Sequence, residues 1–169
     1  MSTCPHCALT FTQLDTQIAC PPVQTGHVND LAALLMSADR ERLEQRCKNI
    51  QRTTNAEFVV VTVRTTAPLK PSEYVFWLAN RWDMGGPENR GLLVLLALNE
   101  RRIESEVGYG LERFVSDGES QQILQEHVVP LLQAGQYAEG LYRAVDILGK
   151  VLAVKQNAAQ GRRWRSYFA

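Results

Sequence analysis

The stretch from Asn89 to Leu111 constrains the fold of this chain more than any other part of it. It contains the apolar run Leu92 to Leu98, which is too short to cross a bilayer and too uniformly apolar for a strand with one wet face. Such a run predicts a central strand that other elements cover on both sides. A turn, a segment of alternating polarity and a Gly-Tyr-Gly loop follow it, and few folds require that order.

The segment after this run predicts the second strand of a hairpin. Asn99 and Glu100 turn the chain, and we expect a two-residue loop with Asn99 at positive φ. Polarity then alternates along the segment, as it does in a strand with one solvated face. The face expected to meet the core carries Ile103, Ser105 and Val107, and the face expected to meet solvent carries Arg102, Glu104 and Glu106.

The periodicity of the chain as a whole predicts the element order βαββαα after an opening helix, which is typical of an α/β fold. Ser37 is a suitable N-cap for the opening helix, and Pro130 should bend or restart the helix that contains it. The expected elements are a helix over 38–53, a strand over Phe58 to Val63, a helix from Pro71, the hairpin, a helix over Asp117 to Ala134, and a final helix over Tyr137 to Lys155.

The hairpin block resembles the TPM domain, the family of thylakoid-lumen acid-phosphatase-like proteins and their bacterial relatives. The family pattern runs roughly as Asn-Gly, an apolar strand, Asp-Arg, an alternating strand and Gly-Tyr-Gly-Leu-Glu. The resemblance covers about residues 28 to 152. It rests on Gly91, Leu92 to Leu98, Asn99 to Arg101 and Gly108 to Glu112, with Val28 to Asp30, Leu31 and Leu34 upstream and Pro130, Gly135, Tyr137, Gly140 and Leu141 downstream.

The resemblance implies a three-layer α/β/α sandwich with a mixed sheet and an antiparallel hairpin. It also implies weak acid phosphatase activity or calcium binding, with acidic residues around the loop before the Asn-Gly strand. This chain departs from the family there, because Asn89-Arg90-Gly91 stands where the family usually has Asp-Asn-Gly. We expect the change to weaken a cation site, whereas the guanidinium fork of Arg90 is suited to a phosphate or a carboxylate.

Polar residues at one edge of the expected sheet form the candidate ligand-binding site. Their oxygen atoms are of the kind that calcium and magnesium take as ligands. The alternatives are that Asp30 and Asp117 cap helices, that Glu88 is simply solvated and that Tyr109 packs over the hairpin end. No catalytic motif is recognisable, so the catalytic residues stay unknown. The candidate ligand-binding residues are Asp30, Glu88, Asn89, Arg90, Tyr109 and Asp117.

Cysteine spacing marks residues 1–27 as a separate segment. Cys4-Pro5-His6-Cys7 has the form of a zinc knuckle, and Cys20 follows near the distance expected for a second pair. Valine replaces the fourth cysteine, so a closed zinc site needs His27, His6 or a ligand from a partner. The alternative is a degenerate ribbon or a mobile reduced tail. Cys47 fits an apolar helix face as a buried thiol instead. The predicted zinc ligands are Cys4, Cys7, Cys20 and His27.

Charge and hydropathy bear on partners and location. The 18 basic and 18 acidic residues give a formal net charge of +0, so we expect no nucleic-acid partner. The sequence shows no leader-like start and no bilayer-length apolar stretch, which predicts a cytoplasmic protein without a transmembrane segment. Residues 28–155 form the expected α/β domain. Residues 156–169 are then a basic, aromatic tail that either frays or makes peripheral contact with an anionic membrane surface.

Two functions of different class follow from these patterns. We favour a TPM-domain protein that acts mainly as a binding or scaffold module, meets a protein partner through its N-terminal segment and has weak or lost catalysis. The alternative is a low-activity, metal-dependent acid phosphatase that acts on phosphomonoesters. In the alternative, the metal ligands or water-positioning groups are Asp30, Glu88, Asn89 and Asp117.

Overall fold

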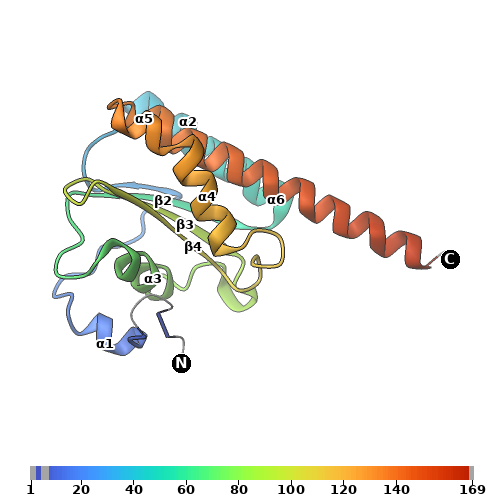
Figure 1. The fold of residues 1–169 in the computed structure, drawn as a ribbon, viewed down its shortest axis with the longest axis horizontal. Helices are drawn as coiled ribbons and strands as arrows, with labels where there is room; N and C mark the ends of the chain where they lie inside the picture. The colour runs from blue at the N-terminus through green and yellow to red at the C-terminus, as the bar shows by residue number, and fades with distance from the viewer. Residues whose placement is uncertain (1–2, 5–7, 168–169) are drawn as a thin grey trace.

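The computed structural model describes residues 3–4 and 8–167, with side chains as far as residue 161 (Figure 1). Its centre is a four-stranded sheet in the order β1-β2-β3-β4. The first three strands run parallel, and the last is antiparallel to its neighbour. The mixed sheet with an antiparallel hairpin that the sequence predicted is therefore confirmed. The strands are β1 (Val28–Asp30), β2 (Glu57–Val63), β3 (Gly91–Ala97) and β4 (Arg102–Val107).

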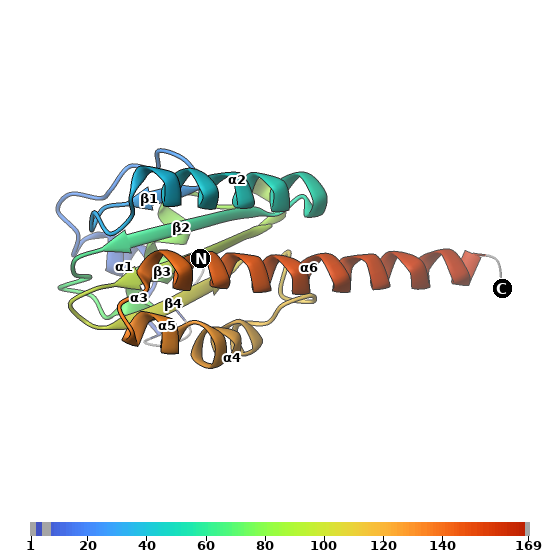
Figure 2. The same ribbon diagram turned by 90° about the horizontal axis from the view of Figure 1, so that it is seen from above.

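Helices cover both faces of the sheet, so the three-layer arrangement is also confirmed (Figures 1 and 2). One face is covered by α2 (Ser37–Thr54), α4 (Asp117–His127), α5 (Val129–Gln133) and α6 (Tyr137–Tyr167). The other face is covered by α3 (Pro71–Arg81), with the short α1 (Phe11–Asp15) outside it. A single turn of 3-10 helix, η1 (Gly86–Glu88), lies in the loop that leads into β3.

Strand β3 is the central strand that the apolar run predicted. All seven of its residues are buried, because side chains alternate between two separate cores. Leu92 and Val94 pack into the core under α2, α4 and α6, and Leu93 and Leu95 pack into the core under α3. Burial on both faces is what a parallel-type strand between two helical layers requires.

The hairpin loop differs from the prediction. Ala97 pairs with Arg102, so the loop runs from Leu98 to Arg101 rather than over two residues. The residue with a left-handed backbone is Arg101, at φ 51°, and not Asn99. Longer hairpin loops are most often built around a turn of ordinary hand, and the left-handed residue then falls at the end of the loop. The two-residue expectation was wrong because residue type at Asn99 could not reveal the register.

The charged face of β4 is less exposed than its alternation predicted. Glu104 is buried and Glu106 is half-buried, because this face packs against the α3 layer. The opposite face meets α4, where the Ser105 hydroxyl lies 2.7 Å from the Ser120 hydroxyl. Strand β4 is therefore an edge strand with two covered faces, and its acidic side chains lie close to protein rather than in open solvent.

Several other element boundaries also differ from the prediction. The strand β1 and the helix α1 were not predicted, and α2 begins one residue earlier than expected, so its N-cap is Met36 and not Ser37. The helix predicted over Asp117 to Ala134 is broken at Val128, two residues before Pro130, as that ring requires.

Helix α6 continues to Tyr167 instead of ending near Lys155, and its last turns project beyond the body of the domain (Figure 2). The residues after Lys155 contain no proline and are mostly fair helix formers, so nothing in them stops the helix. Membrane contact by this segment stays a prediction, because the structure does not describe the side chains from residue 162 on. Within the described residues, no helix is long and apolar enough to span a bilayer.

Candidate functional site

The junction between two loops organises the candidate site. The loop before β3 and the Gly108 to Leu111 loop after β4 touch backbone to backbone, with Gly108 N–H donating to the Gly91 carbonyl at 2.7 Å and Gly110 N–H donating to the Asn89 carbonyl at 2.9 Å. A Cβ atom on Gly110 would lie 2.1 Å from the Glu88 carbonyl oxygen. The Gly-Tyr-Gly signature is therefore explained by close approach of two backbones.

An acidic cavity of about 400 Å³ lies beside this junction, between α3, the loop before β3, the end of β4 and the start of α4. Asn89 and Tyr109 line it, although Tyr109 is 82% exposed and packs over little. Phe76 and Met84 form part of its apolar wall. The acidic residues that line the cavity are Asp83, Glu106, Glu112 and Asp117.

Glu106 is the acidic residue of this cavity whose pKa the surroundings raise. Burial raises the pKa of its carboxyl group, and the nearby carboxylates of Asp117 and Glu112 raise it further, to about 8. Asp117 is held in place because its carboxylate accepts a hydrogen bond from the Val107 N–H at 3.2 Å. Glu106 therefore keeps its proton at neutral pH, and the cavity carries less negative charge than its four acidic residues indicate.

The structure brings five of the six predicted ligand-binding residues to the end of the sheet where β3 begins and β4 ends. These five residues lie on two different sides of the loop before β3. Asn89, Tyr109 and Asp117 line the acidic cavity. Glu88 and Arg90 line a separate cavity that faces α2 and α6. The two positions of the family motif that differ in this chain, Asn89 and Arg90, thus belong to different sites.

Asp30 does not join the other five. It pairs with Thr62 near the carboxyl end of the parallel strands, whereas Gly91 and Val107 mark the opposite edge. Its buried carboxylate accepts hydrogen bonds from the N–H groups of Leu34 and Leu35 at 3.0 and 2.9 Å, and from the Thr62 hydroxyl. The expectation of one cluster was wrong for this residue, because β1 was not foreseen as a strand and its register was therefore unknown.

The surroundings of Asp30 give it a structural role in the connection from β1 to α2. Burial acts to raise the pKa of Asp30, but the hydrogen bonds from Thr62, Leu34 and Leu35, together with nearby Arg40, outweigh burial and lower the pKa below its usual value. Stability from this group is therefore present above pH about 4 and is lost as the pH falls through the lowered pKa.

Replacing Asp30 with asparagine should lower the free energy of unfolding at pH 7 by about 1.5 kcal/mol, since one charged acceptor of three hydrogen bonds is lost. The deficit should shrink as the pH is lowered, because acid removes the same charge from the unaltered protein. Urea unfolding at pH 7 and at pH 3 measures both effects. An equal deficit at the two pH values would contradict the role given to the Asp30 charge.

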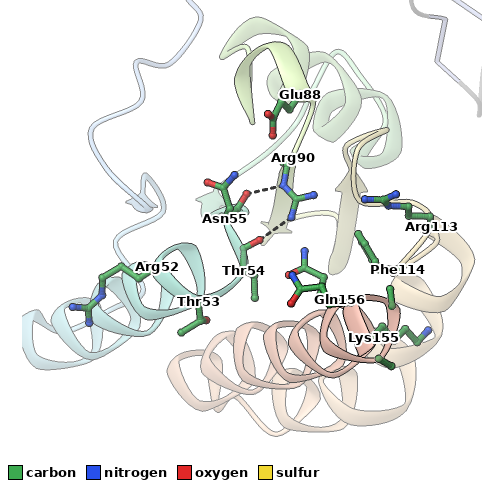
Figure 3. A pocket seen from close by; sticks show the side chains of 13 residues that line it. Arg52, Thr53, Thr54, Asn55, Glu88, Arg90, Arg113, Phe114, Lys155 and Gln156 are labelled. Atoms are coloured by element: carbon green, nitrogen blue, oxygen red, sulfur yellow. Dashed lines mark hydrogen bonds between the residues drawn. The ribbon is translucent and has the colours of Figure 1, made fainter. Parts of the chain in front are cut away.

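Arg90 is engaged by the protein itself. Its Nε donates to the Asn55 carbonyl at 2.8 Å and its Nη2 donates to the Thr54 carbonyl at 2.7 Å, as Figure 3 shows. These carbonyls end α2, where the helix dipole favours a cation. The fork whose shape is suited to a phosphate or carboxylate thus caps a helix, because the chain brings α2 to this loop.

The cysteine segment is described only in part, and Cys7 and His6 lie outside the described residues. The Cys4 N–H donates to the Leu9 carbonyl at 2.8 Å and the Cys4 carbonyl accepts from the Ala8 N–H at 3.0 Å. Cys4 is buried, whereas Cys20 is exposed. The Nδ1 atom of His27 lies 2.7 Å from the Phe58 carbonyl oxygen.

No three His, Cys, Asp or Glu side chains come together as a metal site in the part of the chain that the structure describes. The described zinc candidates, Cys4, Cys20 and His27, therefore do not gather into one site, and zinc binding that includes Cys7 stays a prediction. Cys47 is the core thiol that the helix pattern indicated. Burial and the nearby Glu44 carboxylate raise the pKa of Cys47 to about 12.

Sequence reasoning missed Glu106, Glu112 and Asp83. Glu106 was assigned to a solvated strand face. Glu112 was used only as the end of the Gly-Tyr-Gly-Leu-Glu signature, and Asp83 lies in a loop without a recognisable pattern. The position of Glu106 could have been predicted in part. The hairpin places Glu106 beside the start of β3, where Gly91 and Tyr109 were already expected to meet. Its partial burial depended on the packing of α3, which periodicity does not show.

Comparison with known proteins agrees with this architecture. Residues 28–151 match the TPM domain. The chain belongs to the TPM domain family. The N-terminal domain of a P. gingivalis protein, solved by NMR, is 32% identical with a TM-score of 0.71, and the match covers 90% of this chain and 93% of that one. None of the curated proteins matches the sequence significantly.

Two more distant solved structures share the fold alone. The N-terminal domain of the cg2496 protein from Corynebacterium glutamicum is 14% identical with a TM-score of 0.62, over 79% of this chain and 84% of that one. The BA42 protein from the psychrophilic bacterium Bizionia argentinensis is 16% identical with a TM-score of 0.62, over 72% of this chain and 83% of that one. The resemblance to the TPM domain that the hairpin block indicated is therefore confirmed.

Proposed function

We propose that this TPM domain is a binding module that takes a divalent cation only weakly in its acidic cavity and has little or no phosphatase activity. The arrangement that supports the proposal is the cavity itself, which is lined by Glu106, Glu112, Asp117 and Asn89, although no three of its described carboxylates converge as a ready-made metal site. Carboxylate and amide oxygens are the ligands that calcium and magnesium prefer. The acidic residues are therefore of the right chemical kind.

The same residues fit a tightly held cation poorly. Glu106 holds its proton at neutral pH, so a cation must displace that proton before the carboxylate can bind it. Asn89 supplies a neutral amide at the position where the family usually has an aspartate. Fewer formal charges in a calcium site mean a weaker site, in the range of millimolar dissociation constants.

Calcium titration of the purified chain tests this proposal. We expect a dissociation constant of about 1 mM or weaker for the unaltered protein, as in sites with few formal charges. Asn89→Asp should tighten binding by about tenfold, because it adds a negative charge on the cavity side of the loop, where φ is 50° and an aspartate is tolerated. Calorimetry at constant pH measures both values.

Asn99→Asp is the matched control, since it adds the same charge in the exposed turn at the opposite edge of the sheet. It should leave calcium binding unchanged. Arg90→Asn alone should also leave the affinity nearly unchanged while it destabilises the end of α2, because Arg90 lies on the other side of the loop. Equal gains from Asn89→Asp and Asn99→Asp would contradict the assignment of the cavity.

A chromogenic phosphomonoester assay with calcium or magnesium separates the two functional classes. Hydrolysis should stay near background for the unaltered chain, because no serine, cysteine or histidine is among the described residues that line the acidic cavity. Clear metal-dependent hydrolysis that Glu106→Gln abolishes would favour the acid phosphatase alternative. Binding of a protein partner through the N-terminal segment stays a prediction.

A further inference from the structure

A second cavity, of about 880 Å³, lies at the side of the domain where α6 leaves it (Figure 3). Its walls come from the end of α2, the loop before β3, the segment after the Gly-Tyr-Gly loop, and α6. The volume lies in the range typical of small-molecule sites. The residues used below are Arg52, Glu88, Arg90, Arg113, Phe114, Lys155 and Gln156.

The charge of this cavity is positive. Two of its four basic residues are already engaged, since Lys155 pairs with Glu119 at 2.6 Å and Arg90 caps α2. Arg52 and Arg113 have no acidic partner among the described side chains, although Arg52 Nη2 donates a hydrogen bond to Asn49 Oδ1. Glu88 is the only acidic residue in the described wall. The Arg113 guanidinium lies 4.6 Å above the centre of the Phe114 ring, which holds it at the rim.

Gln156 supplies the second observation. It is only 8% exposed and lines the cavity from α6, between Thr54 and Phe114 in Figure 3. Its Nε2 is buried and has no hydrogen-bond acceptor among the described residues. Buried polar groups in native proteins nearly always have a partner, and the terminal torsion of glutamine turns easily, so an acceptor brought into the cavity can reach this amide.

We propose that this cavity binds a small oxyanion that carries two or more negative charges, with Arg113 and Arg52 supplying charge and Gln156 supplying a buried hydrogen-bond donor. Oxyanions of this kind are phosphates or carboxylates, and both match the guanidinium fork and an amide N–H. Arg90 contributes by neutralising the negative end of α2, which would otherwise repel an anion. The site shares no lining residue with the acidic cavity on the other side of the loop.

Calorimetric titration of the full chain with pyrophosphate, and separately with citrate, tests the site at low salt and without divalent cations. At least one of the two anions should bind with a dissociation constant below about 1 mM. Binding of pyrophosphate alone identifies phosphate chemistry, binding of citrate alone identifies carboxylate chemistry, and binding of both identifies a general polyanion site. Failure of both anions to bind at 10-fold higher concentration, roughly 10 mM, would overturn the proposal.

Variants connect binding to the named residues. Arg113→Gln, at an exposed position, should weaken the anion by about tenfold, as expected for loss of a charge-assisted contact. Gln156→Glu should abolish binding, because it replaces the donor with a charge that repels the anion. Arg143→Gln is the matched control, since it removes an equal charge from α6 at a residue that pairs with Glu139 outside the cavity.

If Gln156→Glu fails to fold, the comparison of Arg113→Gln with Arg143→Gln still tests the proposal. Both of these substitutions change exposed side chains, so both variants should fold. Loss of affinity in Arg113→Gln but not in Arg143→Gln supports the cavity. Equal losses in both variants would show nonspecific attraction to positive surface charge and overturn the proposal. Glu106→Gln should leave anion binding unchanged, so failure of this site and failure of the acidic cavity are distinguishable.

Discussion

Gly110→Ala is expected to lower the free energy of unfolding by about 3 kcal/mol, the upper part of the range for an added methyl group in a tightly packed place. A Cβ atom at this position would lie 2.1 Å from the Glu88 carbonyl oxygen and 3.1 Å from the Asn89 carbonyl oxygen. The backbones must separate to admit it, which breaks the hydrogen bond from Gly110 N–H to Asn89. Chemical denaturation of both proteins measures the loss.

Gly118→Ala provides the control for this prediction. A Cβ atom on Gly118, in the first turn of α4, would meet no atom within 4 Å. Alanine there should change stability by less than about 1 kcal/mol and in the stabilising direction, because it restricts the unfolded chain and favours the helix. If Gly110→Ala were as stable as Gly118→Ala, the two loops would not be in the contact described.

Glu106→Gln is expected to change how stability depends on pH. The pKa of Glu106 is about 8 in the folded protein against 4.5 for the free side chain, so the folded state holds one more proton between these values. Stability from this group is therefore fully present below pH about 4.5 and is lost as the pH rises toward about 8. Glutamine stays neutral, so the variant should avoid this loss.

The difference should be large at alkaline pH. At pH 8 to 9 the variant should be more stable than the unaltered protein by more than about 2 kcal/mol, since each pKa unit corresponds to about 1.4 kcal/mol. Unfolding free energies between pH 5 and pH 9, measured without divalent cations, give the profile. Glu112→Gln removes one of the carboxylates that raise the pKa of Glu106 and should give an intermediate profile. Identical slopes for the unaltered chain and Glu106→Gln would disprove the assignment.

The loop before β3 lets these properties be separated by mutation. Asn89 lines the acidic cavity, and its neighbour Arg90 lines the basic one and caps α2. A change of the Asn89-Arg90 pair to the family's usual Asp-Asn would therefore alter both cavities and the stability of α2 at once. Single substitutions are the more informative experiments, because each reaches only one of the two sites.

The sequence by itself determined the central strand, the hairpin and the family. An unbroken apolar run such as Leu92 to Leu98 is stable as a strand only if other elements bury both of its faces. The residues of the run alone are enough to predict this. The Gly-Tyr-Gly loop could also be recognised from the sequence. Gly108 and Gly110 lie where any side chain would clash with the neighbouring backbone, so only glycine fits there. The candidate edge with Asn89, Tyr109 and Asp117 followed from the return of the hairpin.

Only the tertiary structure decided which of these residues share a site. Asp30 lies at the carboxyl end of the parallel strands, away from the other five residues, because of the register in which β1 pairs with β2. A strand of three residues is too short for its register to be predicted from the sequence. Glu106 acquires its raised pKa from the packing of α3 and from two carboxylates that follow it in the chain. Arg90 meets the end of α2, which precedes it by more than thirty residues. Electrostatics and hydrogen bonding act over a few ångströms in space, and sequence periodicity reports only which face of an element is apolar.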